Sequence, residues 1–400
     1  MMKINYKNQF FLNWLLLLPF GLWPDKETKF TYLQATLFCC LMMSSIIFQL
    51  SRLFTAECSF DLIVRILSST TFFATLTVPT ILFWIHSKTM KYLLYKVEHM
   101  YDELHDRNEI TICEKYRYIA RRFTIIVVIL LMCAMTFATV LLYWPFAFDI
   151  LIPKNESYTI RTMEIVSKFF VVSKKYYFLV MVHLCSAASA GVIVLSAIGT
   201  MLISHFMHAC GMFEIASYRI EQAMAVELLH IFNIRNEIII YRKIICAIDI
   251  QRQAMEFTTF IVTNIETSIF FSTITTVLCI SFNLFRIFQI ESFRDQIEEA
   301  LAHLSVVTVV LGLMFLTNTI GQEVTDHSNN VYVITYSVLW YLAPLRIQKL
   351  ILFVLQRSNK IFILNVGGLF SASLECFATV KLFYLFLRIV EASKLLDCLW

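Results

Sequence analysis

Glu375, Lys381, Tyr384 and Arg388 are the ionisable side chains that stand, with Cys376, inside the last long apolar stretch of the chain, residues 362–390. Lys381, Tyr384 and Arg388 are spaced i, i+3 and i+7, so in a helix they share one face. A charged group at the centre of a bilayer costs about 2.5 to 3.5 kcal/mol on insertion scales and normally faces protein or water. The spacing therefore predicts a polar stripe that borders water or a neighbouring subunit. Polar contacts between subunits alone are the alternative interpretation.

Other chemistry for these residues is disfavoured by the rest of the sequence. A lysine in a last membrane helix could form a Schiff base with a retinal-type cofactor, but no pairing carboxylate can be identified around Lys381. No H-E-x-x-H, C-x-x-C, G-x-x-x-x-G-K-[ST] or G-x-S-x-G motif occurs. The sequence thus indicates no enzyme, no cofactor and no metal site.

The composition indicates which class of protein carries the stripe. Of 400 residues, 58% are hydrophobic and 16% charged, and the mean hydropathy is +0.70, which is too apolar for a soluble protein of this length. With 8 Gly and 6 Pro, the spans are expected to be continuous helices rather than barrel strands. We therefore predict an all-α, polytopic membrane protein in the lipid bilayer. The net charge of +4 is spread over many loops and suggests no nucleic-acid partner.

Seven windows have the length of about 20 apolar residues that crosses a bilayer. They lie at 31–53, 62–86, 123–147, 176–206, 266–290, 301–320 and 362–390. A further stretch, Val331 to Leu355, is interrupted by Pro344 and two basic residues. We expect it to be a membrane-proximal helix packed on protein, with an eighth span as the alternative. Phe10 to Trp23 is expected to be an interfacial helix rather than a signal peptide, because it lacks a small-residue cleavage site.

The distribution of basic residues predicts the orientation. Cytoplasmic segments collect Lys and Arg, and most of the 33 in this chain lie on the side of the N-terminus. The N-terminus is therefore predicted inside and the C-terminus outside, the inverse of a G-protein-coupled receptor. Asn155 begins an Asn-Glu-Ser glycosylation sequon on the predicted outer side.

Two predicted cytoplasmic segments are long. Ser87 to Arg122 and His208 to Asn264 have apolar residues at three- and four-residue intervals, which is typical of helices with one packed face. They are either solvated helix hairpins or an assembly region shared with other subunits. We divide the chain into 1–320, with spans one to six, and 321–400, with the following helix and span seven.

The carboxyl-terminal part contains a set of motifs: Gly321-Gln322, Tyr336, Trp340-Tyr341, Gln356-Arg357-Ser358, Gly367 to Phe370 and SLECFATVKLFYLF from Ser373 to Phe386. In these residues the chain resembles the insect odorant receptor family. The sibling gustatory receptors carry a Thr-Tyr…Gln-Phe signature in the last span, which is absent from this chain.

This resemblance implies a function. The family's members are odorant-gated, non-selective cation channels of four subunits, in which a tuned receptor combines with a shared co-receptor in the plasma membrane of olfactory sensory neurons. The last helix lines the conduit, which assigns Lys381, Tyr384 and Arg388 to it and places a hydrophobic gate near Val390. Arg388 departs from the neutral residue usual there. The alternatives are a metabotropic receptor coupled to G proteins, and a transporter.

The resemblance also places an odorant pocket in the outer half of the membrane, between spans two, three, four and six. Small volatile odorants are apolar, so aromatic, Met and small hydroxyl residues are expected to line it. His183 is a further candidate, and ordinary core packing is the alternative for every candidate. The candidates are Phe72, Phe73, Thr77, Met135, Thr139, Tyr143, Tyr177, Met181 and Cys185.

Overall fold

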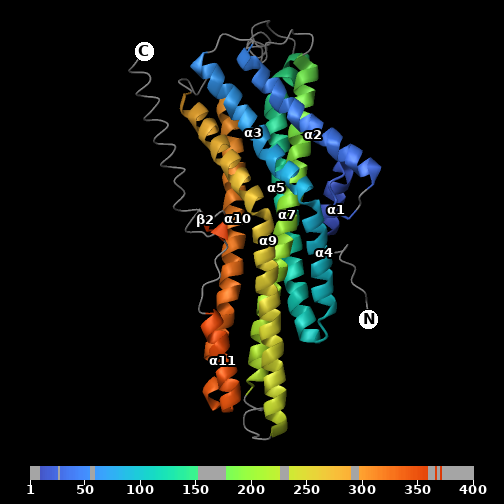
Figure 1. The fold of residues 1–400 in the computed structure, drawn as a ribbon. Coiled ribbons are helices and arrows are strands. Elements are labelled where there is room, and N and C mark those ends of the chain that lie inside the picture. The colour runs from blue at the N-terminus through green and yellow to red at the C-terminus, as the bar shows by residue number, and fades with distance from the viewer. Residues whose placement is uncertain are drawn as a thin grey trace.

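The protein is an elongated bundle of long helices (Figure 1). The computed structural model describes residues 10–25, 28–54, 59–151, 177–225, 234–289 and 297–358, and the pairs 365–366 and 370–371. Apart from two strands of two residues each, the regular elements of this part of the chain are helical. The predicted all-α class is confirmed.

Six of these helices are long and apolar enough to cross a membrane. They coincide with the first six predicted spans, so the protein is a multi-pass membrane protein. Most of the seventh predicted span, 362–390, lies outside the described residues. The six are α2 (Lys29–Leu50), α3 (Phe60–Ile85), α5 (Arg107–Leu151), α7 (Tyr177–Ala223), α9 (Ile234–Gln289) and α10 (Ile297–Ser337).

The start of the seventh span differs from the prediction. β1 (Asn365–Val366) pairs antiparallel with β2 (Phe370–Ser371), and β1 lies against α9. Gly367 and Gly368 stand between the two strands in the sequence, and glycine is a poor helix former that is common in turns. Within the predicted window 362–390, the four described residues are therefore paired strands rather than helix, and the other residues of the window lie outside the described part of the chain.

α7 is the central helix of the bundle and contacts α1, α2, α3, α4, α5, α9 and α10. Small residues along it allow the neighbours to approach closely, as membrane helices require. A Cβ added at Gly191 would lie 3.0 Å from Leu76 Cδ1 of α3 and 3.3 Å from Met42 Sδ of α2. The main core therefore forms around α7, with Met201, Phe213 and Ile215 among its buried members.

Several helices extend well beyond the bilayer. The 56 residues of α9 give a length of about 84 Å at 1.5 Å per residue, against about 30 Å of hydrocarbon. On the predicted cytoplasmic side α4 (Ser87–Asp102) and the start of α5 form a hairpin (Figure 1). The helical reading of the two long cytoplasmic segments is confirmed for their described residues.

The stretch Val331 to Leu355 is not one helix. Its first part completes α10, which ends at Ser337, and a 3-10 turn, η4 (Trp340–Leu342), precedes α11 (Leu345–Ser358). The break falls before Pro344, whose ring disfavours the helical conformation of the preceding residue. α11 packs on α9 and α10, as expected for a membrane-proximal helix. The domain boundary after residue 320 falls inside α10 and stays a prediction.

The N-terminal segment is tied into the bundle. α1 (Phe11–Leu17) and η2 (Leu18–Phe20) precede α2, and a further 3-10 turn, η3 (Ser51–Phe54), follows it. Asn13 is buried, and its Nδ2 donates 2.8 Å hydrogen bonds to Ala197 O and Thr200 Oγ1 of α7. The expected interfacial helix therefore has one face that is packed against protein.

Candidate functional site

Four helices meet around one compact group of apolar side chains. It draws on α3, α5, α7 and α10, the second, third, fourth and sixth spans, and we call it the four-helix apolar cluster. Leu76, Val127, Leu131 and Val192 are its buried members. Half-buried side chains packed on them are Phe72, Met135, Leu195, Val309, Leu313 and Leu316.

The spacing of residues along each helix produces this cluster. Leu131 and Met135 of α5 are four residues apart, and Val309 and Leu316 of α10 are seven apart, so each pair shares a helical face. On α7, Cys185 stands seven residues before Val192 and is aligned with it in the same way. The members therefore lie along one stripe per helix, and the four stripes converge.

Two of the predicted pocket residues lie in the same cluster. Phe72 and Met135 both pack in the four-helix apolar cluster. Met181 is buried and Cys185 half-buried on the aligned side of α7. By helical spacing these four side chains are compatible with one site.

Other predicted residues lie elsewhere. Phe73 belongs to the main core around α7, although its ring meets that of Phe72 edge to face at 5.5 Å between centroids. Thr77 follows Phe73 by four residues on that same face. His183 Nε2 lies 3.2 Å from the hydroxyls of Ser44 and Ser45, so this histidine faces α2 rather than the cluster.

Some predicted residues fall outside what the structure describes. Tyr143 and Tyr177 lie in α5 and α7, but their side chains are not among the described ones. The predicted pore residues and the sequon asparagine lie outside the described residues altogether. These are Lys381, Tyr384, Arg388, Val390 and Asn155.

The hydroxyl groups of the predicted pocket are already engaged as donors. Thr77 Oγ1 donates to Phe73 O at 2.7 Å, and Thr139 Oγ1 donates to Met135 O at 2.9 Å. Each hydroxyl has one hydrogen and two lone pairs, so these groups retain only acceptor capacity. A ligand beside these threonines would be held mainly by apolar contacts and by the fit of its shape.

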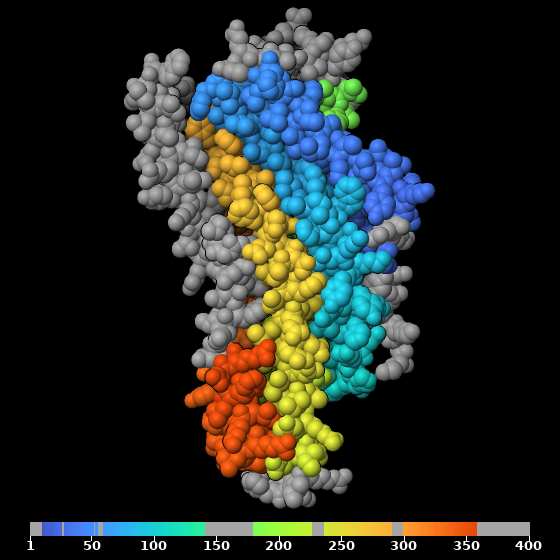
Figure 2. Space-filling view, in the orientation of Figure 1, coloured from blue at the N-terminus to red at the C-terminus, as the bar shows by residue number. Residues whose placement is uncertain are grey.

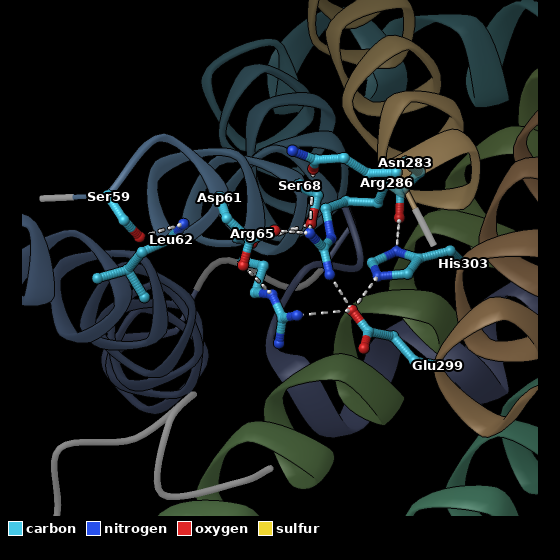
Figure 3. Close-up of polar contacts among 10 residues, drawn as sticks. Ser59, Asp61, Leu62, Arg65, Ser68, Asn283, Arg286, Glu299 and His303 are labelled. Atoms are coloured by element: carbon cyan, nitrogen blue, oxygen red, sulfur yellow. Dashed lines mark hydrogen bonds and ion pairs between the residues drawn. The ribbon is translucent and has the colours of Figure 1, made fainter. Parts of the chain in front are cut away.

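A charged group lies near one end of the bundle, on α3, α9 and α10 (Figure 3). Arg286 of α9 is 2% exposed and makes close ion pairs with Asp61 of α3 and Glu299 of α10. Arg65 Nε lies 3.0 Å from Asp61 Oδ2, and Arg65 Nη2 lies 3.8 Å from Glu299 Oε1. We call these four residues with His303 the outer ion-pair cluster, after the side that the predicted orientation gives them.

His303 is oriented by its neighbours. Asn283 Nδ2 donates to Cys279 O at 2.7 Å, which leaves Asn283 Oδ1 to accept from His303 Nδ1 at 2.8 Å. His303 Nε2 then faces Glu299 Oε1 at 3.8 Å. The group has two guanidiniums and two carboxylates, so its formal charges balance when the imidazole is neutral.

Sequence reasoning missed the outer ion-pair cluster. It expected span six to border the pocket but named no residue of α10. The available signal was the spacing: Arg65 precedes Phe72 by seven residues, and Glu299 precedes His303 by four. The spacing does not show which helices the faces that carry Arg65 and Glu299 pack against.

The predicted cytoplasmic end of the bundle has polar contacts of its own. Arg219 of α7 donates to both carboxylate oxygens of Glu109 of α5, at 2.6 and 2.8 Å, and to Cys246 O of α9 at 3.0 Å. Between α4 and α5, the Arg117 guanidinium lies 3.8 Å from the centre of the Tyr101 ring. Burial raises the pKa of Tyr101, so its ring stays neutral.

An apolar surface remains exposed at this end of the molecule. Ile347, Ile351 and Leu355 of α11 are buried toward α9, while the opposite side of the same helix faces outward (Figure 2). Exposed there, with the adjoining end of α10 and η4, are Tyr336, Tyr341, Leu342, Leu345, Leu352 and Phe353. We call this set the α10–α11 surface.

No group of three His, Cys, Asp or Glu side chains in the described part of the chain is placed to hold a metal ion.

Comparisons with known proteins agree with this fold. The family model described as 7tm Odorant receptor matches residues 59–384. No curated protein matches the sequence. The fold is similar to that of the insect olfactory receptor OR5 from Machilis hrabei in complex with eugenol, with a TM-score of 0.73, 12% identity and 97% coverage of both chains. A second structure of that receptor gives a TM-score of 0.71 at 12% identity, covering 96% of this chain and 97% of that one.

Proposed function

Because the chain belongs to the 7tm odorant receptor family, we propose that it is the odorant-binding subunit of a ligand-gated, non-selective cation channel. The observation that carries the proposal is the four-helix apolar cluster, which lies between the spans where this family is expected to bind its ligand. The structure of the similar receptor OR5 was solved in complex with eugenol, which is a ligand of OR5.

The ligand is proposed to be a small, volatile, largely apolar molecule. Phe72, Leu76, Met135 and Val309 offer aromatic and aliphatic contact, and the hydroxyl of Thr139, one turn from Met135, can accept but not donate. A site of this kind discriminates weakly between close analogues, since one methylene is worth about 1 to 3 kcal/mol. Recognition then depends on the size and shape of the ligand.

The channel is proposed to be a tetramer with a co-receptor, in the plasma membrane of olfactory sensory neurons. The α10–α11 surface supports assembly, because exposed apolar patches outside the bilayer are typical of protein interfaces. The last span is proposed to line the conduit with Lys381, Tyr384 and Arg388, and Val390 to form the gate. An odorant opens the channel to the extent that it binds the open arrangement better than the closed one.

The test is expression of the receptor with and without the co-receptor, with currents recorded against an odorant panel. We expect currents that need both subunits, appear within milliseconds to seconds and persist when G proteins are blocked. Charge-removing changes Lys381→Gln and Arg388→Gln should alter the conductance or cation selectivity. Currents that need a G protein, or that are indifferent to both changes, would refute the channel.

A further inference from the structure

The outer ion-pair cluster lies on the same faces of α3 and α10 as the proposed ligand site. Arg65 precedes Phe72 by seven residues, which places the two side chains on one face about 10 Å apart along α3. Glu299 precedes Leu313 by fourteen residues, which is close to four whole turns and places the two side chains on one face about 21 Å apart along α10. A path from the predicted outer side to the four-helix apolar cluster, between α3 and α10, therefore passes this group.

Arg286 is the fixed member of the group. It is 2% exposed, pairs with a carboxylate on each neighbouring helix, and also donates from Nη1 to Gln289 Oε1 at 3.1 Å. Loss of a partner would leave a buried charge uncompensated, which is costly. Arg286 thus holds α3, α9 and α10 together.

Arg65 is placed differently. Its 3.8 Å contact with Glu299 is longer than a hydrogen bond, so it is an electrostatic contact that is easily broken. Arg65 also pairs with Asp61 of its own helix at 3.0 Å, and the Asp61 side chain is 49% exposed. Glu299 in turn keeps Arg286 and faces His303. Both partners therefore remain paired when the Arg65–Glu299 contact opens.

We propose that the Arg65 side chain is the outer gate of the ligand site, and that odorants enter and leave between α3 and α10 when the Arg65–Glu299 contact opens while Arg65 stays paired with Asp61. A neutral, apolar ligand passes this gate without forming an ion pair with it. This inference rests on the proposed function, because it assigns the route to the ligand site proposed above.

A gate that does not touch the bound ligand changes the rates of entry and exit alike. Removal of the charge in Arg65→Gln, and in Arg65→Met, which keeps much of the side-chain length, should therefore speed both the onset of the odorant current and its decay on washout by more than about threefold. The half-maximal concentration should change by less than about threefold, because the two rates change together. Arg65→Lys, which keeps the charge, should remain close to wild type.

The matched control is Arg252→Gln, which removes an arginine from the exposed pair with Asp249 on the cytoplasmic part of α9. All variants are expressed with the co-receptor and counted at the cell surface. The gate would be overturned if the rates of current onset and decay in Arg65→Gln and Arg65→Met match those of Arg252→Gln. Failure of both variants to reach the surface would also overturn it, because Arg65 would then be a structural residue. A wild-type receptor silent to every odorant would instead refute the proposed function.

Discussion

Phe72 is the predicted pocket residue whose surroundings the structure defines best, because it packs in the four-helix apolar cluster and meets the ring of Phe73. Phe72→Leu shortens the side chain and removes an aromatic face from the proposed site. We expect the half-maximal odorant concentration to rise by about tenfold, which corresponds to the loss of about 1.4 kcal/mol of binding energy.

The control for this change is Phe137→Leu, the same substitution at a ring of α5 that is 51% exposed. Side chains on that face are expected to meet lipid, so dose–response curves should match those of wild type. Equal shifts in both variants would place the effect of Phe72 outside ligand binding.

Glu109 gives a second residue-scale prediction, at the cytoplasmic end. Its side chain is 7% exposed and accepts two hydrogen bonds from Arg219. Breaking a buried ion pair costs about 3 to 5 kcal/mol, and the 23% exposure of Arg219 reduces this, so we expect Glu109→Gln to lower the free energy of unfolding by about 2 kcal/mol. Thermal unfolding of the detergent-solubilised receptor measures the change.

Glu256→Gln is the matched control, because Glu256 is 62% exposed and lies 3.8 Å from Arg252. Exposed pairs contribute about 0 to 1 kcal/mol, so its midpoint of unfolding should hardly move. If the two variants unfold at the same temperature, the ion pair between Glu109 of α5 and Arg219 of α7 contributes little to the free energy of unfolding.

At the scale of elements, the packing of α7 depends on where its glycines lie. Gly191→Ala would push a methyl group against Leu76 at 3.0 Å, whereas a Cβ at Gly199 meets nothing within 4 Å. We expect Gly191→Ala to destabilise the receptor. Gly199→Ala should be neutral or stabilising, because alanine is favoured over glycine in helices by up to about 1 kcal/mol. Comparison of their unfolding midpoints tests this, and the opposite order would contradict the close approach of α3 and α7.

The elements themselves could be predicted from the sequence, but their partners could not. Apolar windows located the six described spans because hydrocarbon thickness sets their length. The paired strands at 365–366 and 370–371 were missed because an apolar window cannot distinguish a helix from buried strands. Phe72 and Met135 were placed in one site by resemblance, while the contributions of Leu313 and of the ion pairs of Arg286 depend on which faces meet in three dimensions.

At the scale of the whole molecule, α11 has two apolar sides and only one of them is covered within the described chain. Ile347 and Ile351 are buried, whereas Leu345 is 75% and Phe353 is 53% exposed. This part of the chain lies at the lower end of the bundle (Figures 1 and 2), on the predicted cytoplasmic side. Without a protein partner, this apolar surface would therefore be in contact with water. Burial of apolar surface contributes about 25 cal/mol per Å². The α10–α11 surface should stabilise the complex with the co-receptor.

The double variant Leu345→Ser with Phe353→Ser removes two anchors from this surface without touching the side of α11 that packs on α9. We expect the amount of co-receptor recovered with the receptor to fall by about tenfold or more, since interface anchors each contribute about 1 to 2 kcal/mol or more. Tyr118→Ser is the control, because Tyr118 is a similarly exposed ring, at 62%, on the cytoplasmic part of α5. Unchanged recovery of the co-receptor, with the receptor itself folded by its unfolding midpoint, would show that subunits meet through another surface.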